Sequence, residues 1–269
     1  RSIKYVLLPS SMEISFINKS GSRPFKERFD LPNFILAVVS LVIFVIVYLS
    51  QPMNPLFIPE NDSQSDFPHP SKNVFPTWGL AIIMVVVPLF VAFLMLLLRK
   101  RYSAFIKEFN PFSALWMYIL IVVTSLTVTE IFKRYVGRAR PDIYSVCGKN
   151  TQYEDCKSKL SSSKLKDQFK SWPSGHSSMS ITSMYVVAAF IQEAVNCNHA
   201  YVAYLGVFFI AFAFFVASTR INDFRHHADD VVAGLLMGFI VSEFMWKKCK
   251  KEVFKEIVSE RSEERRVGK

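Results

Sequence analysis

Histidines, arginines and a lysine gather in three short polar segments of this chain, and the first segment covers residues 133–141. It reads KRYVGRARP and places Lys133 and Arg140 seven positions apart. A helix continued through the segment would put both side chains on one face, two turns apart, until Pro141 ended it. Two converging cations suit a phosphate, which arginine can bind through two hydrogen bonds. The alternative is a plain basic flank of a helix.

The second segment reads PSGH from Pro173 to His176 and continues with two serines. Ser174 is a preferred residue at a helix N-terminus, and Gly175 lets the backbone approach a ligand closely. Because the first N–H groups of a helix are free, such a terminus binds anions. His176 would stand at the rim of this site, where it can act as a general acid. A solvated capping turn with an incidental histidine is the alternative.

The third segment, residues 219–230, reads TRINDFRHHADD. His226 and Asp230 are four positions apart, so one helical turn would let the carboxylate hold the imidazole in one tautomer and make it more nucleophilic. Arg220 adds a third cation. A metal site is the alternative, with ligands drawn from His226, His227, Asp229 and Asp230. Neighbouring residues on a helix point in different directions, which argues against that alternative.

Three cations, two histidines and one carboxylate together predict a phosphoryl-transfer site. One histidine would attack phosphorus, and the other would protonate the leaving oxygen. The three cations would stabilise the negative charge that a metal ion could otherwise stabilise. We therefore expect neither a metal nor another cofactor.

The rest of the chain must supply helices that bring these segments together. Of its 269 residues, 51% are hydrophobic and only 20% are charged, which excludes a disordered chain. Six stretches approach the roughly 20 apolar residues that a membrane-spanning helix requires. They are residues 34–49, 79–98, 109–129, 176–195, 199–218 and 230–246. We expect an all-α protein, a six-transmembrane helix bundle, because six such runs leave too little polar chain for a globule with buried core helices.

Basic residues in the short loops predict the orientation of this bundle. Lysines and arginines are concentrated before the first stretch, between the second and third, and after the sixth, so these parts should face the cytosol. The chain would then have a cytosolic segment, residues 1–30, a membrane domain, residues 31–250, and a cytosolic tail, residues 251–269. Residues 131–173 are basic although they would face the opposite side. We attribute that charge to an anionic substrate at the extracytosolic membrane face.

The net charge of +10 could also indicate a nucleic-acid partner, but beside so many apolar runs it favours a membrane and an anionic ligand. Cys147 and Cys156 lie in one extracytosolic loop, where an oxidising compartment would allow a disulfide. Asn61 begins an Asn-Asp-Ser sequence, which accepts N-linked glycans. Residues 1–11, which precede Met12, and the polar residues 261–269 are candidates for sequence that is not native.

The three segments, in this order, resemble the type 2 phosphatidate phosphatase (lipid phosphate phosphatase) superfamily. Its pattern reads K-x6-RP, then PSGH, then SR-x5-H-x3-D, and the one departure is Thr219, where the family usually has serine. The resemblance implies that His226 is the nucleophile that forms a phosphohistidine, that Asp230 orients it, and that His176 protonates the leaving alcohol. It also implies a set of phosphate-binding residues: Lys133, Arg140, Ser174, Gly175 and Arg220.

The resemblance further implies a metal-independent membrane enzyme that acts on phosphatidate, lysophosphatidate, ceramide 1-phosphate and sphingosine 1-phosphate. Both the plasma membrane and the endoplasmic reticulum place the expected active-site face outside the cytosol. A homo-oligomer is compatible with the sequence, which does not determine the oligomeric state. Other branches of the superfamily, such as glucose-6-phosphatase or a sphingosine-phosphate phosphatase, are the nearest alternatives. A catalytically inactive relative that binds lipid is a third interpretation, and a transporter or channel is a fourth.

Overall fold

The computed structural model describes residues 29–50, 52, 56–195 and 200–254. Within those ranges the regular elements are helices and no β-strand forms, so the prediction of an all-α protein is confirmed. Each predicted apolar stretch coincides with one long helix, and the predicted and observed ends differ by at most seven residues. These helices are α2 (Leu31–Leu49), α3 (Thr77–Arg101), α4 (Pro111–Val136), α8 (Gly175–Ala194), α9 (Ala200–Asn222) and α10 (Ala228–Val253). The predicted cytosolic segment and tail lie almost entirely outside the described residues, as do residues 1–11 and 261–269.

Helices α2, α3, α4 and α9 are long and apolar enough to cross a membrane, judged by length and composition. Helices α8 and α10 are long enough but more polar. Helix α8 carries serines and threonines in its first half and is buried along most of its length, while α10 begins with acidic residues and ends with lysines. The described structure thus supports membrane crossing for four helices, and the count of six stays a prediction.

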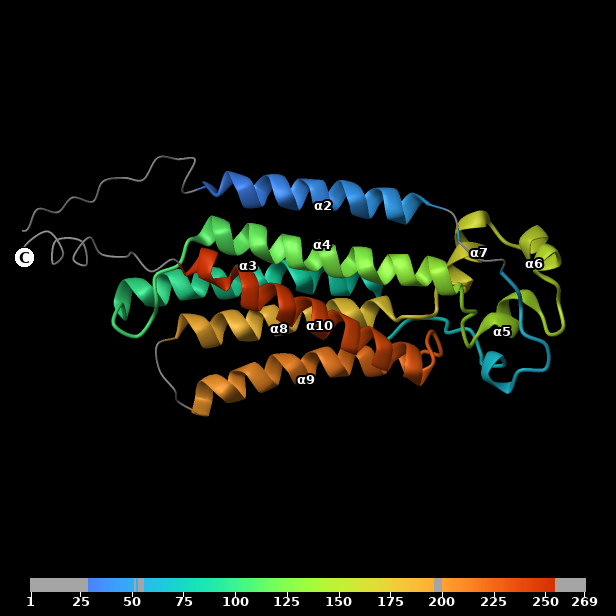
Figure 1. Ribbon diagram of the computed structural model, residues 1–269. Coiled ribbons are helices and arrows are strands. Elements are labelled where there is room, and N and C mark those ends of the chain that lie inside the picture. The colour runs from blue at the N-terminus through green and yellow to red at the C-terminus, as the bar shows by residue number, and fades with distance from the viewer. Residues whose placement is uncertain (1–28, 51, 53–55, 196–199, 255–269) are drawn as a thin grey trace, which may run out of the picture.

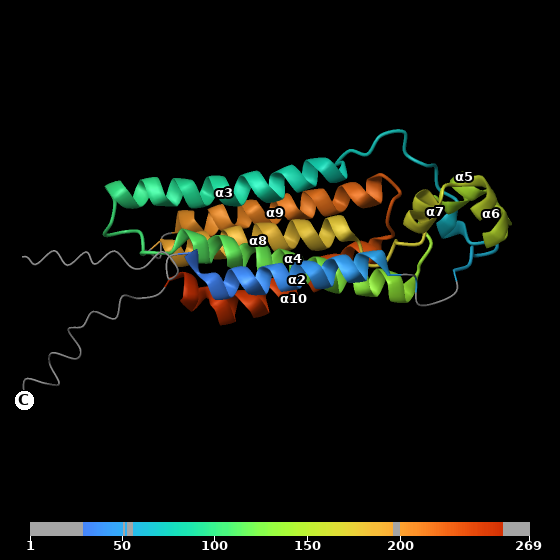
Figure 2. The same ribbon diagram turned by 90° about the horizontal axis from the view of Figure 1, so that it is seen from above.

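The long helices run side by side, and α8 lies inside the bundle (Figures 1 and 2). It packs against α3, α4, α9 and α10. Helix α2 packs on α4 at the edge of the bundle and exposes many apolar side chains, as a helix in contact with lipid would. Because α8 lies inside the bundle, the three polar segments meet around its first turn.

Two glycines of α10 set how closely α10 approaches α8. A Cβ atom on Gly234 would collide with the carbonyl oxygen of Ser174, and one on Gly238 would collide with that of Ser178. Only glycine lets two backbones approach so closely. The contact holds the first turn of α8 beside the first turn of α10, which brings the second and third polar segments together.

Hydroxyl groups join α8 to α4 in the same half of the bundle. The Ser125 hydroxyl lies 2.9 Å from that of Thr182, and the Thr129 hydroxyl lies 2.8 Å from that of Ser178. These groups are buried and satisfy one another, as polar side chains inside a bundle must. Because Lys133 follows Thr129 by one helical turn, this contact also places the lysine over the N-terminus of α8.

Short helices form a cap over the same end of the bundle (Figure 1). They are η1 (Ser63–Ser65), α5 (Ile143–Cys147), α6 (Tyr153–Lys159) and α7 (Ser162–Gln168). The apolar side chains of Ile143, Leu165 and Phe169 pack together in the cap, and a disulfide joins Cys147 to Cys156. Asn61 is exposed just before η1, where its glycosylation stays a prediction.

Candidate active site

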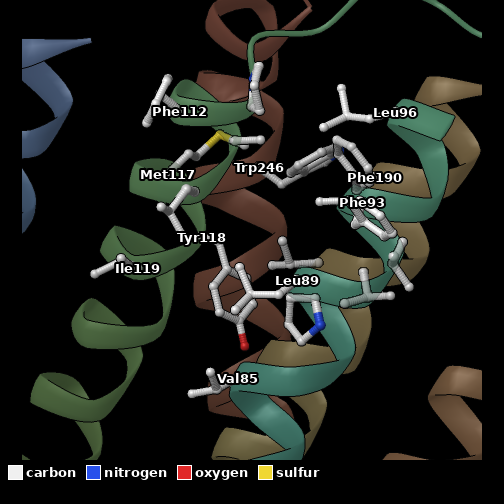
Figure 3. A pocket seen from close by; sticks show the side chains of 18 residues that line it. Val85, Leu89, Phe93, Leu96, Phe112, Met117, Tyr118, Ile119, Phe190 and Trp246 are labelled. Atoms are coloured by element: carbon white, nitrogen blue, oxygen red, sulfur yellow. The ribbon is translucent and has the colours of Figure 1, made fainter. Parts of the chain in front are cut away.

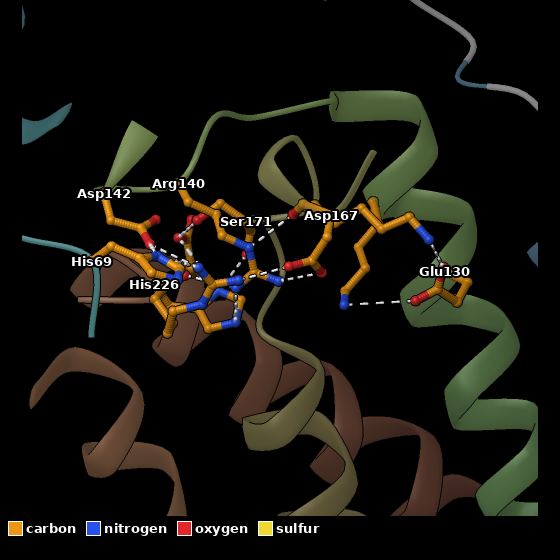
Figure 4. Close-up of polar contacts among 11 residues, drawn as sticks. His69, Glu130, Arg140, Asp142, Asp167, Ser171 and His226 are labelled. Atoms are coloured by element: carbon orange, nitrogen blue, oxygen red, sulfur yellow. Dashed lines mark hydrogen bonds and ion pairs between the residues drawn. The ribbon is translucent and has the colours of Figure 1, made fainter. Parts of the chain in front are cut away.

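All three predicted polar segments converge beneath this cap, and Figure 4 shows Arg140 of the first segment near His226 of the third. The ammonium group of Lys133 lies 3.0 Å from the position that a Cβ atom on Gly175 would take. Nη1 of Arg140 lies 3.3 Å from Nε2 of His226. The residues predicted from the three segments therefore lie close together, although 93 positions separate Lys133 from His226 along the chain.

Arg140 reaches the site by a different route from the predicted one. Helix α4 ends at Val136, because Gly137 adopts a left-handed conformation with φ 61° and caps the helix. The expectation that Lys133 and Arg140 share one helical face, with Pro141 ending the helix, is wrong. Arg140 instead lies in the following loop, where its N–H donates to the carbonyl oxygen of Gln168 at 2.9 Å.

His226 is buried, and a backbone group fixes its ring. Its Nδ1 atom lies 2.7 Å from the carbonyl oxygen of Ser171. A carbonyl only accepts hydrogen bonds, so Nδ1 carries the proton and Nε2 keeps its lone pair. Burial, reinforced by the positive charges of Arg140 and Lys133 and opposed by Asp230, lowers the pKa of His226 to about 3. The imidazole is therefore neutral at physiological pH, with its free nitrogen beside Arg140.

Asp230 supports the orientation of the His226 ring indirectly, through Ser171. Helix α10 begins at Ala228, so His226 precedes the helix and the expected one-turn spacing does not apply. The Asp230 carboxylate lies 3.8 Å from Nδ1 of His226 and accepts a hydrogen bond from the Ser171 hydroxyl at 2.6 Å. It lies closer to His227, accepting from its backbone N–H at 2.8 Å and contacting its Nδ1 at 3.0 Å.

Asp230 is also one of the residues that the alternative of a metal site would require. Potential ligand atoms of His227, Asp229 and Asp230 lie within 4.8 Å of one another, whereas Nδ1 of His226 is bonded to Ser171. The guanidinium of Arg138 pairs with both aspartates, at 2.7 Å for Asp230. One fixed cation thus already pairs with the two carboxylates that a metal would need, which weighs against the metal alternative.

The second segment forms a helix N-terminus, as predicted. Ser174 is fully buried and caps α8, since its hydroxyl accepts hydrogen bonds from the backbone N–H and the hydroxyl of Ser177. The backbone N–H of Ser174 donates to the carbonyl oxygen of Asp230 at 2.9 Å. Ser174 is thus engaged within the fold. The first N–H groups of α8, those of Gly175 and His176, precede its internal hydrogen bonds and remain for an anion.

His176 and Arg220 complete the cluster. Nε2 of His176 is buried and has no hydrogen-bond partner among the described residues. His176 interacts electrostatically with Arg220, Lys133 and Arg140 and with His226. Arg220 is buried at the end of α9, where it donates to Asp223 at 2.6 Å and to the Thr219 hydroxyl at 3.0 Å. Threonine thus supplies the hydroxyl that serine would supply at this position.

A chain of ion pairs that sequence reasoning missed extends from Arg140 toward the surface (Figure 4). Asp167 bridges Arg140 at 2.9 Å and Arg225 at 2.6 Å, and Arg225 also donates to the buried Asp142 at 2.7 Å. Asp142 in turn lies 2.5 Å from His69. Burial alone would raise the pKa of Asp167, but the guanidinium groups of Arg140 and Arg225 lower it to about 2. The carboxylate therefore remains charged and fixes both arginines.

Long apolar helices thus end at a buried cluster of guanidinium, ammonium and imidazole groups, an arrangement that suits a membrane protein with an anionic ligand. Comparison with known families identifies its kind. Residues 114–253 match the PAP2 superfamily, a range that includes all three polar segments. The chain belongs to this superfamily, which confirms the family predicted from the segments.

Individual relatives are distant in sequence. Lipid phosphate phosphatase 2 of Arabidopsis thaliana is 25% identical over 230 residues, which cover 81% of this chain and 77% of the relative. Probable diacylglycerol pyrophosphate phosphatase 1 of Schizosaccharomyces pombe is 28% identical over 226 residues, or 80% and 78% of the two chains. Phospholipid phosphatase 2 of Homo sapiens is 28% identical over 151 residues, or 51% and 52%. No solved structure matches significantly.

Proposed function

We propose that this protein is an integral membrane lipid phosphate phosphatase that hydrolyses phosphatidate and related lipid phosphates through a phosphohistidine on His226. One observation carries the proposal. The bond from Nδ1 of His226 to the Ser171 carbonyl leaves Nε2 unprotonated, buried and 3.3 Å from Arg140. A neutral imidazole next to a phosphate-binding cation is the nucleophile that phosphoryl transfer requires.

In the first step, Nε2 of His226 attacks phosphorus, and the bond from phosphorus to the lipid oxygen breaks. His176, which takes up a proton when the phosphate dianion binds, donates this Nε2 proton to that oxygen, so the lipid leaves as an alcohol. In the second step, His176 accepts a proton from water, and the resulting hydroxide attacks phosphorus. The phosphorus–nitrogen bond breaks, inorganic phosphate leaves, and His226 regains its lone pair while His176 is again protonated.

The cations bind the phosphate and stabilise charge in both steps. Lys133, Arg140 and Arg220 would contact its oxygens, and the N–H groups of Gly175 and His176 would donate at the helix terminus. Ser174 would act by capping the N-terminus of α8 at that point. Three fixed positive charges replace a metal ion, so we propose a metal-independent reaction.

We further propose that all six long helices cross the membrane and that the site faces away from the cytosol, at the plasma membrane or in the endoplasmic reticulum. The disulfide between Cys147 and Cys156 supports this orientation, because it lies in the cap above the site and disulfides persist in oxidising compartments. The names of the relatives, which include lipid phosphate and phospholipid phosphatases, support a lipid substrate. A lipid headgroup can enter such a site from the adjacent leaflet.

The test measures phosphate release from short-chain phosphatidate in detergent with excess EDTA, comparing the unaltered protein with His226→Ala. Lys157→Gln, a change on the exposed face of α6, is the matched control. We expect activity that survives EDTA, persists in the control and is lost in His226→Ala. Activity that is lost in EDTA would instead indicate a metal site at His227, Asp229 and Asp230. An inactive but folded unaltered protein would favour a soluble phosphate substrate, tested with glucose 6-phosphate, or a binding role without catalysis.

A further inference from the structure

An apolar groove lies between α3 and α4 (Figure 3). Its lining comes largely from the C-terminal half of α3 and the N-terminal half of α4, so it lies in the half of the bundle away from the cap. Its volume is about 400 Å³, and hydrocarbon side chains line nearly all of it. Val187 and Trp246 lie on its buried floor, whereas Leu89 and Phe93 on α3 and Phe112 on α4 are exposed along its rims. The groove is therefore open to whatever surrounds these two helices.

A polar cluster closes the inner end of the groove. The Tyr118 hydroxyl donates to the carbonyl oxygen of Met84 at 2.5 Å and lies 2.7 Å from the Ser183 hydroxyl. On α8, the groove begins at Val186, ten residues after His176, which is a rise of about 15 Å along the helix. The groove is thus separate from the candidate active site.

The length of the groove matches the depth of one membrane leaflet. Val85 and Leu96 stand near its two ends, eleven residues apart on α3, a rise of about 16 Å. The hydrocarbon core of a bilayer is about 30 Å thick, so one leaflet contributes roughly half of that. In a membrane crossed by α3 and α4, the groove would face the acyl chains of a single leaflet.

The outer end of the groove carries positive charge. Leu89, Phe93 and Leu96 follow one another at helical spacing on the groove side of α3. Lys100 follows Leu96 by four positions and continues the same stripe past the end of the groove. Lys100 and Arg101 are exposed and form no ion pair with any other residue in the described ranges. A cation thus stands where the headgroup of a lipid in the groove would lie.

We propose that this groove binds one acyl chain of an anionic phospholipid from the leaflet that surrounds the C-terminal end of α3, with the lipid phosphate at Lys100. The apolar lining selects a hydrocarbon chain, and the unpaired cation selects a negatively charged headgroup. The chain fills the space between α3 and α4 and so stabilises their packing. Under the orientation proposed above, this is the cytosolic leaflet, where anionic lipids are concentrated.

Trp246 on the groove floor allows a direct test. The protein with Trp78, Trp116 and Trp172 changed to phenylalanine is reconstituted in phosphatidylcholine vesicles. Phosphatidylglycerol with brominated acyl chains, a phosphodiester and so no substrate for a monoesterase, is added as the quencher. We expect saturable quenching of Trp246, with half-saturation at about fivefold lower mole fraction than for brominated phosphatidylcholine, the effect of one lysine near a membrane surface.

Three variants of this protein complete the test. Ala92→Phe fills the groove and should abolish saturable quenching, whereas Ala81→Phe, on an exposed face of α3 outside the groove, should leave it unchanged. Lys100→Gln should make the two headgroups equivalent. Quenching that rises in proportion to mole fraction, equally for both lipids and regardless of Ala92→Phe, would show ordinary surrounding lipid and overturn the proposal.

A second measurement guards against loss of folding in the triple tryptophan variant. Lipid phosphorus retained after detergent washing is compared in the otherwise unaltered protein, Ala92→Phe and Ala81→Phe. Retention of about one more phosphatidylglycerol in the unaltered protein and in Ala81→Phe than in Ala92→Phe supports the site. Equal retention in all three contradicts it. Neither measurement depends on phosphatase activity, so failure here and failure of the proposed enzyme are distinguishable.

Discussion

Nδ1 of His226 lies 2.7 Å from the carbonyl oxygen of Ser171, a residue 55 positions earlier in the chain. A backbone group thus sets the tautomer of the buried imidazole. Asp230, which the sequence pattern assigns to this task, lies 3.8 Å away and accepts from the Ser171 hydroxyl instead. The Asp230 carboxylate thus supports Ser171, which orients the ring. This indirect role of Asp230 has measurable consequences.

Asp230→Asn should reduce kcat more than Ser171→Ala. The first change removes the charge that accepts from Ser171 and His227 and pairs with Arg138, whereas the second removes one hydroxyl and keeps the orienting carbonyl. Hydrogen bonds to charged groups contribute about 1.5–3 kcal/mol, so we expect a loss of about tenfold for Ser171→Ala and about a hundredfold or more for Asp230→Asn. Steady-state kinetics on short-chain phosphatidate measures both. Equal losses would mean that Asp230 acts only through that hydroxyl.

His176→Ala should depend on the leaving group. Protonation of the leaving oxygen contributes about 10²–10⁴-fold when that oxygen belongs to a poor leaving group such as an alkyl alcohol. We therefore expect a loss in that range on phosphatidate and a much smaller loss on an activated aryl phosphate. The ratio of kcat/KM values for the two substrates is the readout. An identical loss on both would assign His176 to binding and not to acid catalysis.

Asp167→Asn tests the carboxylate that bridges Arg140 and Arg225. Without its negative charge, two guanidinium groups lose a common partner, so they should attract phosphate more strongly but hold it less accurately. We expect inorganic phosphate to inhibit several-fold more strongly while kcat falls. Asp155→Asn, at an exposed position of α6, provides the control and should match the unaltered protein. Weaker inhibition by phosphate in Asp167→Asn would contradict this account.

The lowered pKa of His226 predicts a pH-dependent stability. The imidazole titrates near 6.5 in the unfolded chain but only at about 3 in the fold, so the unfolded state binds the proton first as pH falls. Stability present above pH 6.5 is therefore lost progressively below it, by about 2 kcal/mol between pH 7.5 and pH 5. Thermal unfolding in detergent should show a smaller drop in Tm over this range for His226→Gln. The same drop in both proteins would place the pKa near its usual value.

Asn61→Gln tests the membrane orientation. Asn61 is exposed in the loop that precedes η1, on the side of the cap, and its acceptor sequence is used only where the chain faces a lumen. After expression in eukaryotic cells, the unaltered protein should migrate more slowly on a gel than Asn61→Gln, and glycosidase treatment should abolish the difference. A glycan lost instead on Asn18→Gln, outside the described residues, would indicate the inverted topology.

Local patterns sufficed to predict the helices and much of the site. Apolar runs of about 20 residues predict helix positions well, because a buried or lipid-facing helix must be apolar along its length. The three polar segments also proved to be neighbours. The prediction misplaced the end of α4, because it continued the helix to Pro141 although Gly137 is the residue type that commonly ends a helix. It therefore misplaced Arg140 on the helical face of Lys133.

Contacts between separate loops could not be predicted. Ser171, Asp167 and His69 have no spacing relationship to His226, and each depends on how the cap folds over the bundle. Helix α8 shows the opposite difficulty, because its hydroxyl groups are satisfied by α4 and so reduce its hydropathy without exposing it to water. Composition alone therefore underestimates how deeply such a helix is buried.

The glycine contacts between α10 and α8 fix the helical part of the site separately from the cap. Because Gly234 and Gly238 hold the two backbones together, we expect His226 and His176, the nucleophile and acid that we propose, to keep one mutual geometry. If the proposed function holds, substrate preference would then be determined by the cap and its salt-bridged loops, which lie outside this contact.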